Sequence, residues 1–213
     1  MAPSSAVSIT WVRTLAIDTP HGPANAHLHP ADESRGALIL GHGAGGGVTA
    51  PDLVAVTAAA RDVGFDVALV EQPYRVAGRR APAPARQLDA AWTVVVDQLR
   101  AGELRGLSLV VGGRSLGARV ACRTVEHTGA IGVLCLAFPL LPPRRKAAPQ
   151  SRLPELDAVT VPVLVVQGER DPFGMPPPGP GREVVQVPGD HGLKTDIPAV
   201  AAAAGDWLQR VTG

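Results

Sequence analysis

Two features that are scarce in this 213-residue chain exclude one class of partner. Aromatic residues make up only 3% of the chain, and 20 Lys and Arg residues against 19 Asp and Glu residues leave a formal net charge of +1. A nucleic-acid-binding domain needs a basic surface and aromatic side chains on which bases can stack. We therefore expect no nucleic-acid partner.

Cysteines and long apolar runs are also scarce. Cys122 and Cys135 both lie in apolar stretches and are expected to be small buried residues; a disulfide between them is geometrically possible, but nothing indicates a secreted scaffold. The first ten residues lack the basic and apolar regions of a signal peptide, and no apolar run approaches the ~18 residues of a membrane span. We expect a soluble cytoplasmic protein without a membrane partner.

What the chain does contain is a regular alternation of apolar strand-like runs and amphipathic helical segments. The runs expected to be strands are 8–17 and 25–30, both at an edge, followed by 36–43, 65–72, 107–112, 131–138, 161–168 and 183–189. The segments expected to be helices are 51–64, 86–102, 115–129 and 198–211. This order predicts an α/β fold with a mostly parallel central sheet and helices on both faces. The length fits a single domain spanning residues 1–213.

Three loops rich in Pro, Gly and Arg connect these elements, at 73–86, 139–154 and 174–182. Each follows a predicted strand, so we expect all three to gather at the carboxyl edge of the sheet, where open α/β sheets bind ligands. The second loop is too short and too rich in proline for a helical lid. We therefore expect no large lid domain and an open site.

The stretch GGRSLGARVA, residues 112–121, places Ser115 between an apolar strand and a helix, with Gly113 and Gly117 two residues away on either side. A serine on such a turn is held with φ above zero, and the residues two before and two after it must be very small. The pattern predicts a nucleophile elbow that presents the hydroxyl above the sheet. The alternative is a glycine-rich loop with an incidental serine.

A serine nucleophile needs a base, and in this architecture an acid and then a histidine should follow it along the chain. Two histidines follow Ser115. His127 lies about three helical turns away and cannot reach the hydroxyl. His191, in the loop after the last predicted strand, is the expected base.

The candidate acids are Glu169, Asp171 and Asp190. Asp171 is favoured because Pro172 restricts its backbone and fixes a turn directly after a predicted strand. Asp190 adjoins His191 in sequence and cannot easily orient the ring, while Glu169 is expected to be a solvated or ion-paired loop residue.

The anion of a tetrahedral intermediate needs backbone donors, and two segments can supply them. Leu116 follows the nucleophile and begins a helix, and Ala44 lies in GHGAGGG, where Gly43 to Gly47 would let the main chain approach the reacting carbonyl. This run lacks the further residues of a phosphate-binding or dinucleotide-binding loop. His42 is expected to be a structural histidine bonded to nearby backbone.

Taken together, the stretches GHGAGGG, GGRSLGARVA, CLAFPLLPP, VQGERDPFG and GDHGLK resemble the α/β-hydrolase superfamily, most of all its dienelactone-hydrolase-like branch with the KANSL-Tex-type proteins. The resemblance covers residues 38–194 and implies the α/β-hydrolase fold with a Ser115, Asp171 and His191 triad. Dienelactone hydrolases use a cysteine nucleophile, so Ser115 departs from them and their lactone substrate does not carry over. Some eukaryotic relatives are complex subunits, so the fold alone does not guarantee turnover.

These observations predict a serine hydrolase acting as a carboxylesterase on a small-molecule ester or thioester, with no metal and no organic cofactor. Two alternatives remain open: a weak or inactive protein that uses the fold for interaction, and amide or peptide hydrolysis on the same triad. Arg114 and the loop cations Arg75, Arg79, Arg80, Arg144, Arg145 and Lys146 form either a positive mouth for an anionic substrate or a solvated rim.

Overall fold

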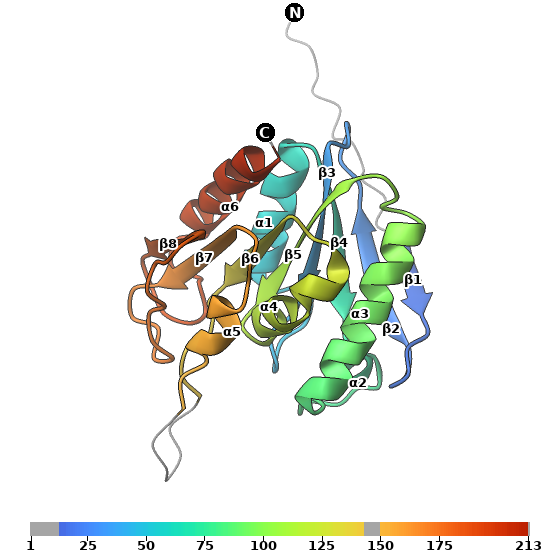
Figure 1. Cartoon of the computed structure of the whole chain (residues 1–213), viewed down its shortest axis with the longest axis horizontal. Coiled ribbons are helices and arrows are strands. Elements are labelled where there is room, and N and C mark those ends of the chain that lie inside the picture. Colours follow the sequence, from blue (N-terminus) through green and yellow to red (C-terminus); the bar gives the residue numbers. More distant parts are fainter. Residues whose placement is uncertain (1–12, 143–149, 213) are drawn as a thin grey trace, which may run out of the picture.

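A computed structural model describes residues 13–142 and 150–212, which include one eight-stranded sheet (Figure 1). Its strands are β1 (Arg13–Ile17), β2 (Ala24–His29), β3 (Gly36–Gly41), β4 (Phe65–Glu71), β5 (Ser108–Arg114), β6 (Gly132–Leu136), β7 (Val163–Gly168) and β8 (Arg182–Val187). They lie side by side in the order β1-β2-β4-β3-β5-β6-β7-β8.

In this order, neighbouring strands from β4 through β3 to β8 pair in parallel, whereas β1 pairs antiparallel with β2, and β2 antiparallel with β4. The mostly parallel sheet is therefore as predicted, but the assignment of 25–30 to an edge strand is wrong. β2 pairs on both sides. Its polar residues alternate with buried alanines because one face of the strand is buried and the other is only half-buried, a pattern that resembles an edge strand.

Helices cover both faces of the sheet, as expected. They are α1 (Pro51–Asp62), α2 (Pro73–Val76), α3 (Ala85–Ala101), α4 (Leu116–Thr128), α5 (Leu153–Asp157) and α6 (Ile197–Val211). One buried cluster joins residues of α3 and α4 to the sheet, and a second joins residues of α1 and α6 to it. In Figure 1, α3 and α4 lie over the face of the sheet turned to the viewer.

The central strand β3 shows why the sequence reads as an uninterrupted apolar run. Ala37 and Ile39 belong to the cluster with α3 and α4, while Leu38 and Leu40 belong to the cluster with α1 and α6, and all four are fully buried. A strand covered on both faces has no position left for a polar side chain. The buried parallel strand predicted at 36–43 is confirmed and ends at Gly41.

The three predicted loops are more structured than the sequence indicates. The first contains the short helix α2, and the second, of which residues 143–149 lie outside the described ranges, ends in the first residues of the five-residue α5. The third starts at the carboxyl edge, but Gly181 accepts a hydrogen bond from the Val163 amide at the start of β7, so the loop crosses to the opposite edge. It must do so because β8 runs parallel to β7 and begins at that edge.

Cys122 and Cys135 are buried, free thiols, with 3.6 Å between their sulfur atoms. Within the described ranges, no helix is long and apolar enough to cross a membrane.

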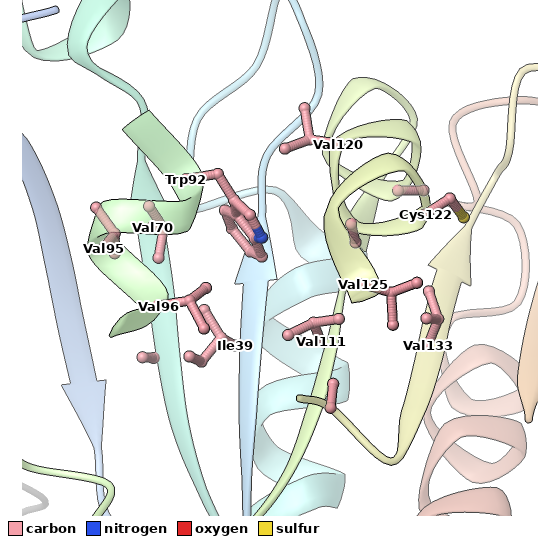
Figure 2. Close-up of a cluster of buried hydrophobic side chains, with 14 of the residues drawn as sticks. Ile39, Val70, Trp92, Val95, Val96, Val111, Val120, Cys122, Val125 and Val133 are labelled. Carbon is pink, nitrogen blue, oxygen red and sulfur yellow. The ribbon is translucent and has the colours of Figure 1, made fainter. Parts of the chain in front are cut away.

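Trp92 anchors α3 in the first cluster, where its fully buried ring packs among valine and isoleucine side chains of the sheet (Figure 2). We expect Trp92→Ala to lower the free energy of unfolding by about 3–5 kcal/mol, because removing the ring loses its buried contacts and leaves a cavity in the core. Urea denaturation measures this. Val54→Ala on α1 is the control, because its side chain is 52% exposed and should change stability by less than about 0.5 kcal/mol. Equal effects of the two substitutions would contradict the assigned role of Trp92.

Candidate active site

Ser115 occupies a strained turn between β5 and α4, as the sequence predicts. Its φ is +51° and its ψ is −102°, a conformation that non-glycine residues rarely adopt. The Ser115 amide donates to the carbonyl of Leu136 at the end of β6, at 2.8 Å. α4 begins at the next residue, so the hydroxyl lies at the amino end of a helix.

Gly113 and Gly117 have no room for a side chain because of a third glycine, Gly41, which the sequence alone did not single out. A side-chain carbon at either Gly113 or Gly117 would collide with the carbonyl oxygen of Gly41, the last residue of β3. Gly41 is confined less severely, because a side chain there would meet Gly117 and the Trp92 ring, each at 3.2 Å. The elbow therefore exists because three backbones approach one another where no side chain fits.

The structure brings together the three side chains predicted to act with one another. His191 Nε2 lies 2.9 Å from the Ser115 hydroxyl, and His191 Nδ1 lies 2.8 Å from Asp171 Oδ2. Because a carboxylate can only accept, Nδ1 carries the proton and Nε2 is free to accept from the hydroxyl. The Asp171 carboxylate is buried, while the His191 side chain is 20% exposed. This is a continuous hydroxyl–imidazole–carboxylate chain.

Gln167 holds the carboxylate, and sequence reasoning missed it. Its Nε2 donates to Asp171 Oδ2 at 2.8 Å and also lies within hydrogen-bond distance of the carbonyls of Phe138 and Gly174. The Phe173 amide donates to the other carboxylate oxygen. The available signal was one polar residue inside the otherwise apolar run VPVLVVQG, where a fully buried amide must find partners.

The loop that carries His191 is fixed by close packing. A side chain at Gly168, the last residue of β7, would collide with the carbonyl of Asp190, and Gly189 has a φ of +116°. The Phe173 ring meets the imidazole edge-on, with 4.5 Å between centroids. The imidazole is therefore held by packing as well as by hydrogen bonds.

The other two candidate acids lie elsewhere, in agreement with their predicted roles. Glu169 is exposed. Asp190 is exposed and its carboxylate accepts from the amide of Gly192, which stabilises the turn. His127, the second histidine considered, is exposed on the last turn of α4.

His42 is a buried structural histidine, as expected, and it orients the loop proposed to bind the oxyanion. Its Nδ1 donates to the Gly43 carbonyl at 2.8 Å, and its Nε2 accepts from the Gln72 amide at 3.2 Å. Burial lowers the pKa of His42, which favours this neutral form. Since the peptide is trans and planar, a Gly43 carbonyl held on one side directs the Ala44 N–H to the other.

Tyr74 of α2 supports the same loop from its next carbonyl. Its hydroxyl donates to the Ala44 carbonyl at 3.0 Å, and burial raises the pKa of Tyr74 to about 12, so the donor stays protonated. Leu116 is the first residue of α4, and amides of a first helical turn have no acceptor within the helix. Both expected oxyanion donors thus lie on fixed backbone.

The glycines of this loop differ in what they require. A side chain at Gly43 would lie 2.9 Å from Arg114 Nη1, whereas side chains at Gly45, Gly46 and Gly47 would meet nothing within 4 Å. Gly43 is therefore confined by the Arg114 guanidinium beneath the loop, and the expectation that the run lets the main chain approach the reacting carbonyl stays a prediction.

Arg114 itself differs from both sequence interpretations. It is neither a free cation at a positive mouth nor part of a solvated rim, because its side chain is 18% exposed and forms an ion pair with the buried Asp52 of α1. Arg79 and Arg80 are exposed, whereas Arg144, Arg145 and Lys146 lie outside the described residues. Among residues 13–142 and 150–212, no group of three or more His, Cys, Asp or Glu side chains could hold a metal ion.

Comparison with known proteins agrees with this fold. The family model described as an alpha/beta hydrolase domain matches residues 34–186. No curated protein matches the chain in sequence.

Solved structures share the fold at low identity. A serine hydrolase without a lid from Xanthomonas campestris is 18% identical, with a TM-score of 0.72 and 97% of each chain covered. Est1E from Butyrivibrio proteoclasticus, solved with ferulic acid bound, is 16% identical (TM-score 0.73; 92% of this chain and 98% of that chain). A dienelactone hydrolase from Anabaena variabilis is 15% identical (TM-score 0.73; 94% and 98%).

The packing around Gly117 predicts a severe effect of any branched side chain there. We expect Gly117→Val to lower the free energy of unfolding by about 3 kcal/mol or more, because its side chain would strike the Gly41 backbone. Gly46→Ala, in open space, should leave stability nearly unchanged. Thermal unfolding of both variants tests this, and a fully stable Gly117→Val protein would show that the turn is not tightly packed.

The environment of His42 predicts a dependence of stability on pH. Burial lowers its pKa in the folded state, so its contribution is complete above the unfolded value of 6.5 and is lost as the pH falls below it. The advantage of the wild type over His42→Gln in free energy of unfolding should therefore be largest at pH 7–8 and shrink towards pH 5. Urea titrations at several pH values measure the difference. The pKa of His29 is also lowered, but His29 is present in both proteins. An advantage that does not change with pH would contradict the assigned role of His42.

Proposed function

Because this chain belongs to the alpha/beta hydrolase domain family, we propose that it is a serine hydrolase that cleaves a carboxylic ester or thioester through an acyl-enzyme on Ser115. One observation carries the proposal: the unbroken hydrogen-bonded chain from the Ser115 hydroxyl through His191 to Asp171, at 2.9 Å and 2.8 Å, on a strained elbow. Strained backbone beside an activated nucleophile is expensive to maintain and is characteristic of catalytic sites.

In the acylation step, the Ser115 oxygen forms a bond to the acyl carbon while His191 Nε2 takes the hydroxyl proton. The charge that develops on the imidazole is stabilised by the Asp171 carboxylate. As the tetrahedral intermediate collapses, the carbonyl re-forms, the bond to the leaving alcohol or thiol breaks, and His191 returns the proton to it. Water then attacks the acyl-enzyme with His191 as base, which releases the acid and restores Ser115.

The negative charge of the intermediate is assigned to two backbone donors, the amides of Ala44 and Leu116. Support comes from the bonds that fix these groups beforehand: His42 holds the Gly43 carbonyl, Tyr74 holds the Ala44 carbonyl, and Leu116 begins α4. Donors held in place in the free enzyme need no rearrangement as charge develops.

A small or exposed acyl ester suits the surroundings of the serine. Ser115, Leu116 and Ala44 are all partly exposed, and between β6 and β7 the described residues contain only one helix, the five-residue α5. A cavity of about 190 Å³ lies along α2 and the start of α3; none of the residues that line it belongs to the triad, but Tyr74, which bonds the Ala44 carbonyl, forms part of its wall. Est1E has been solved with ferulic acid bound, which supports a small acyl group for this chain as well.

The rim offers less positive charge to an anionic substrate than the sequence alone indicated. Arg114 is paired with Asp52 and contributes no free charge there, whereas Arg75 keeps its charge while it donates to the carbonyl of Arg79. With the charge of Arg114 neutralised, we favour a neutral ester. The cytoplasmic location expected from the sequence stays a prediction.

Covalent labelling tests the proposal directly. A fluorophosphonate probe should label the wild type and fail to label Ser115→Ala.

His191→Ala should fold normally and hydrolyse p-nitrophenyl acetate more slowly by several orders of magnitude, because the base is lost. Circular dichroism and thermal unfolding supply the folding control. A well-folded wild type that is neither labelled nor hydrolytic would support a non-catalytic interaction protein instead, and rates that are faster on anilides than on esters would indicate an amidase.

A further inference from the structure

Arg114 is the last residue of β5, directly before Ser115, and its guanidinium meets three separate segments. Nε forms an ion pair with Asp52 Oδ2 of α1 at 2.8 Å, and Nη2 donates to the main-chain carbonyl of His191 at 3.0 Å. Nη1 lies beneath Gly43, where a side-chain carbon would come within 2.9 Å of it. The Arg114 side chain therefore contacts both the loop that carries His191 and the loop that carries Gly43, and Arg114 itself directly precedes Ser115 in the chain.

The charge of Arg114 is balanced inside the protein. The Asp52 side chain is 1% exposed, and the ion pair with Arg114 compensates its charge. Burial raises the pKa of Asp52 and the neighbouring Arg114 opposes that effect. A buried carboxylate and guanidinium that neutralise each other leave little attraction for a substrate anion.

The geometry gives this pair a different use. Ser115 and His191 lie 76 positions apart in the chain, and their side chains must meet within hydrogen-bond distance. The hydrogen bond from Arg114 to the His191 carbonyl ties the main chain of the loop that carries His191 to the residue next to Ser115. Asp52 fixes the direction in which the guanidinium points.

We infer that Arg114, oriented by Asp52, is a positioning residue that sets the distance between His191 and Ser115 and supports the oxyanion loop at Gly43. The inference rests on the proposed function, since it assigns a role within that triad. A side-chain carbon at position 43 would crowd this guanidinium, whereas one at Gly45, Gly46 or Gly47 would meet nothing within 4 Å. A lysine cannot replace the arginine, because its single ammonium group cannot reach Asp52 and the His191 carbonyl in the planar arrangement of a guanidinium.

The test compares Arg114→Lys with Arg119→Lys. Arg119 lies on the first turn of α4, its side chain is 20% exposed, and it pairs through two nitrogens with Glu155, so its replacement disturbs a partly buried arginine–carboxylate pair outside the triad. The measurements are kcat and KM for p-nitrophenyl acetate, the rate of fluorophosphonate labelling, and the thermal unfolding midpoint.

We expect Arg114→Lys to fold, because the ion pair with Asp52 survives, and to lose about tenfold to a hundredfold in kcat and in labelling rate with KM nearly unchanged. Arg119→Lys should keep kcat within about twofold of the wild type, because it disturbs no group that contacts the triad. The double variant Asp52→Asn with Arg114→Gln leaves no lone buried charge and should show the same loss of kcat, which separates positioning from charge.

Each other outcome has a defined meaning. A folded Arg114→Lys enzyme with wild-type kcat, or an equal loss in Arg119→Lys, overturns the positioning role while leaving the proposed function intact. A wild type that the probe does not label overturns the proposed function and this inference together. A crystal structure of Arg114→Lys adds a readout independent of turnover, in which the distance from His191 Nε2 to Ser115 Oγ should exceed 3.5 Å; a distance unchanged from 2.9 Å contradicts the inference.

Discussion

The site depends on the approach of three backbones, those of Gly41, Gly113 and Gly117, which leaves no room for a side chain at Gly113 or Gly117. This contact forces the chain to turn sharply at Ser115, and the turn determines both the height of the hydroxyl and the start of α4. The buried Trp92 ring packs against Gly41, so the hydrophobic core and the turn at Ser115 form one packed unit. The strain at Ser115 is balanced by that core.

The turn is also held from the other face of the sheet. Trp92 reaches it from α3, while Asp52 of α1 reaches Arg114 from the opposite side. The acid and the base depend on a different part of the sheet, the ends of β7 and β8, where Gly168 packs against the Asp190 carbonyl. Groups distant in sequence therefore meet because each one is anchored to a strand end, and parallel strands present these ends at one edge.

Local sequence patterns were sufficient to predict much of this arrangement. Ser115 could be found because its glycines and flanking elements lie within ten residues, and His191 because few histidines follow it. What the sequence could not provide were relations across the sheet: the close approach of Gly41 to Gly113 and Gly117, the pairing of Arg114 with Asp52 and the bond from Gln167 to the Phe138 carbonyl all join residues that no local pattern connects. The edge assignment of 25–30 failed for the same reason, since strand order is a property of the assembled sheet.

Gln167 has a consequence for which residues its position can accept. Its amide nitrogen faces three oxygens at once, those of Phe138, Gly174 and the Asp171 carboxylate. A side chain of the same length and shape that carried a second carboxylate there would turn every attraction into a repulsion, and one of the two acids would have to take up a proton. Position 167 thus demands a hydrogen-bond donor rather than polarity in general, and this requirement constrains the strand as strictly as its apolar neighbours do.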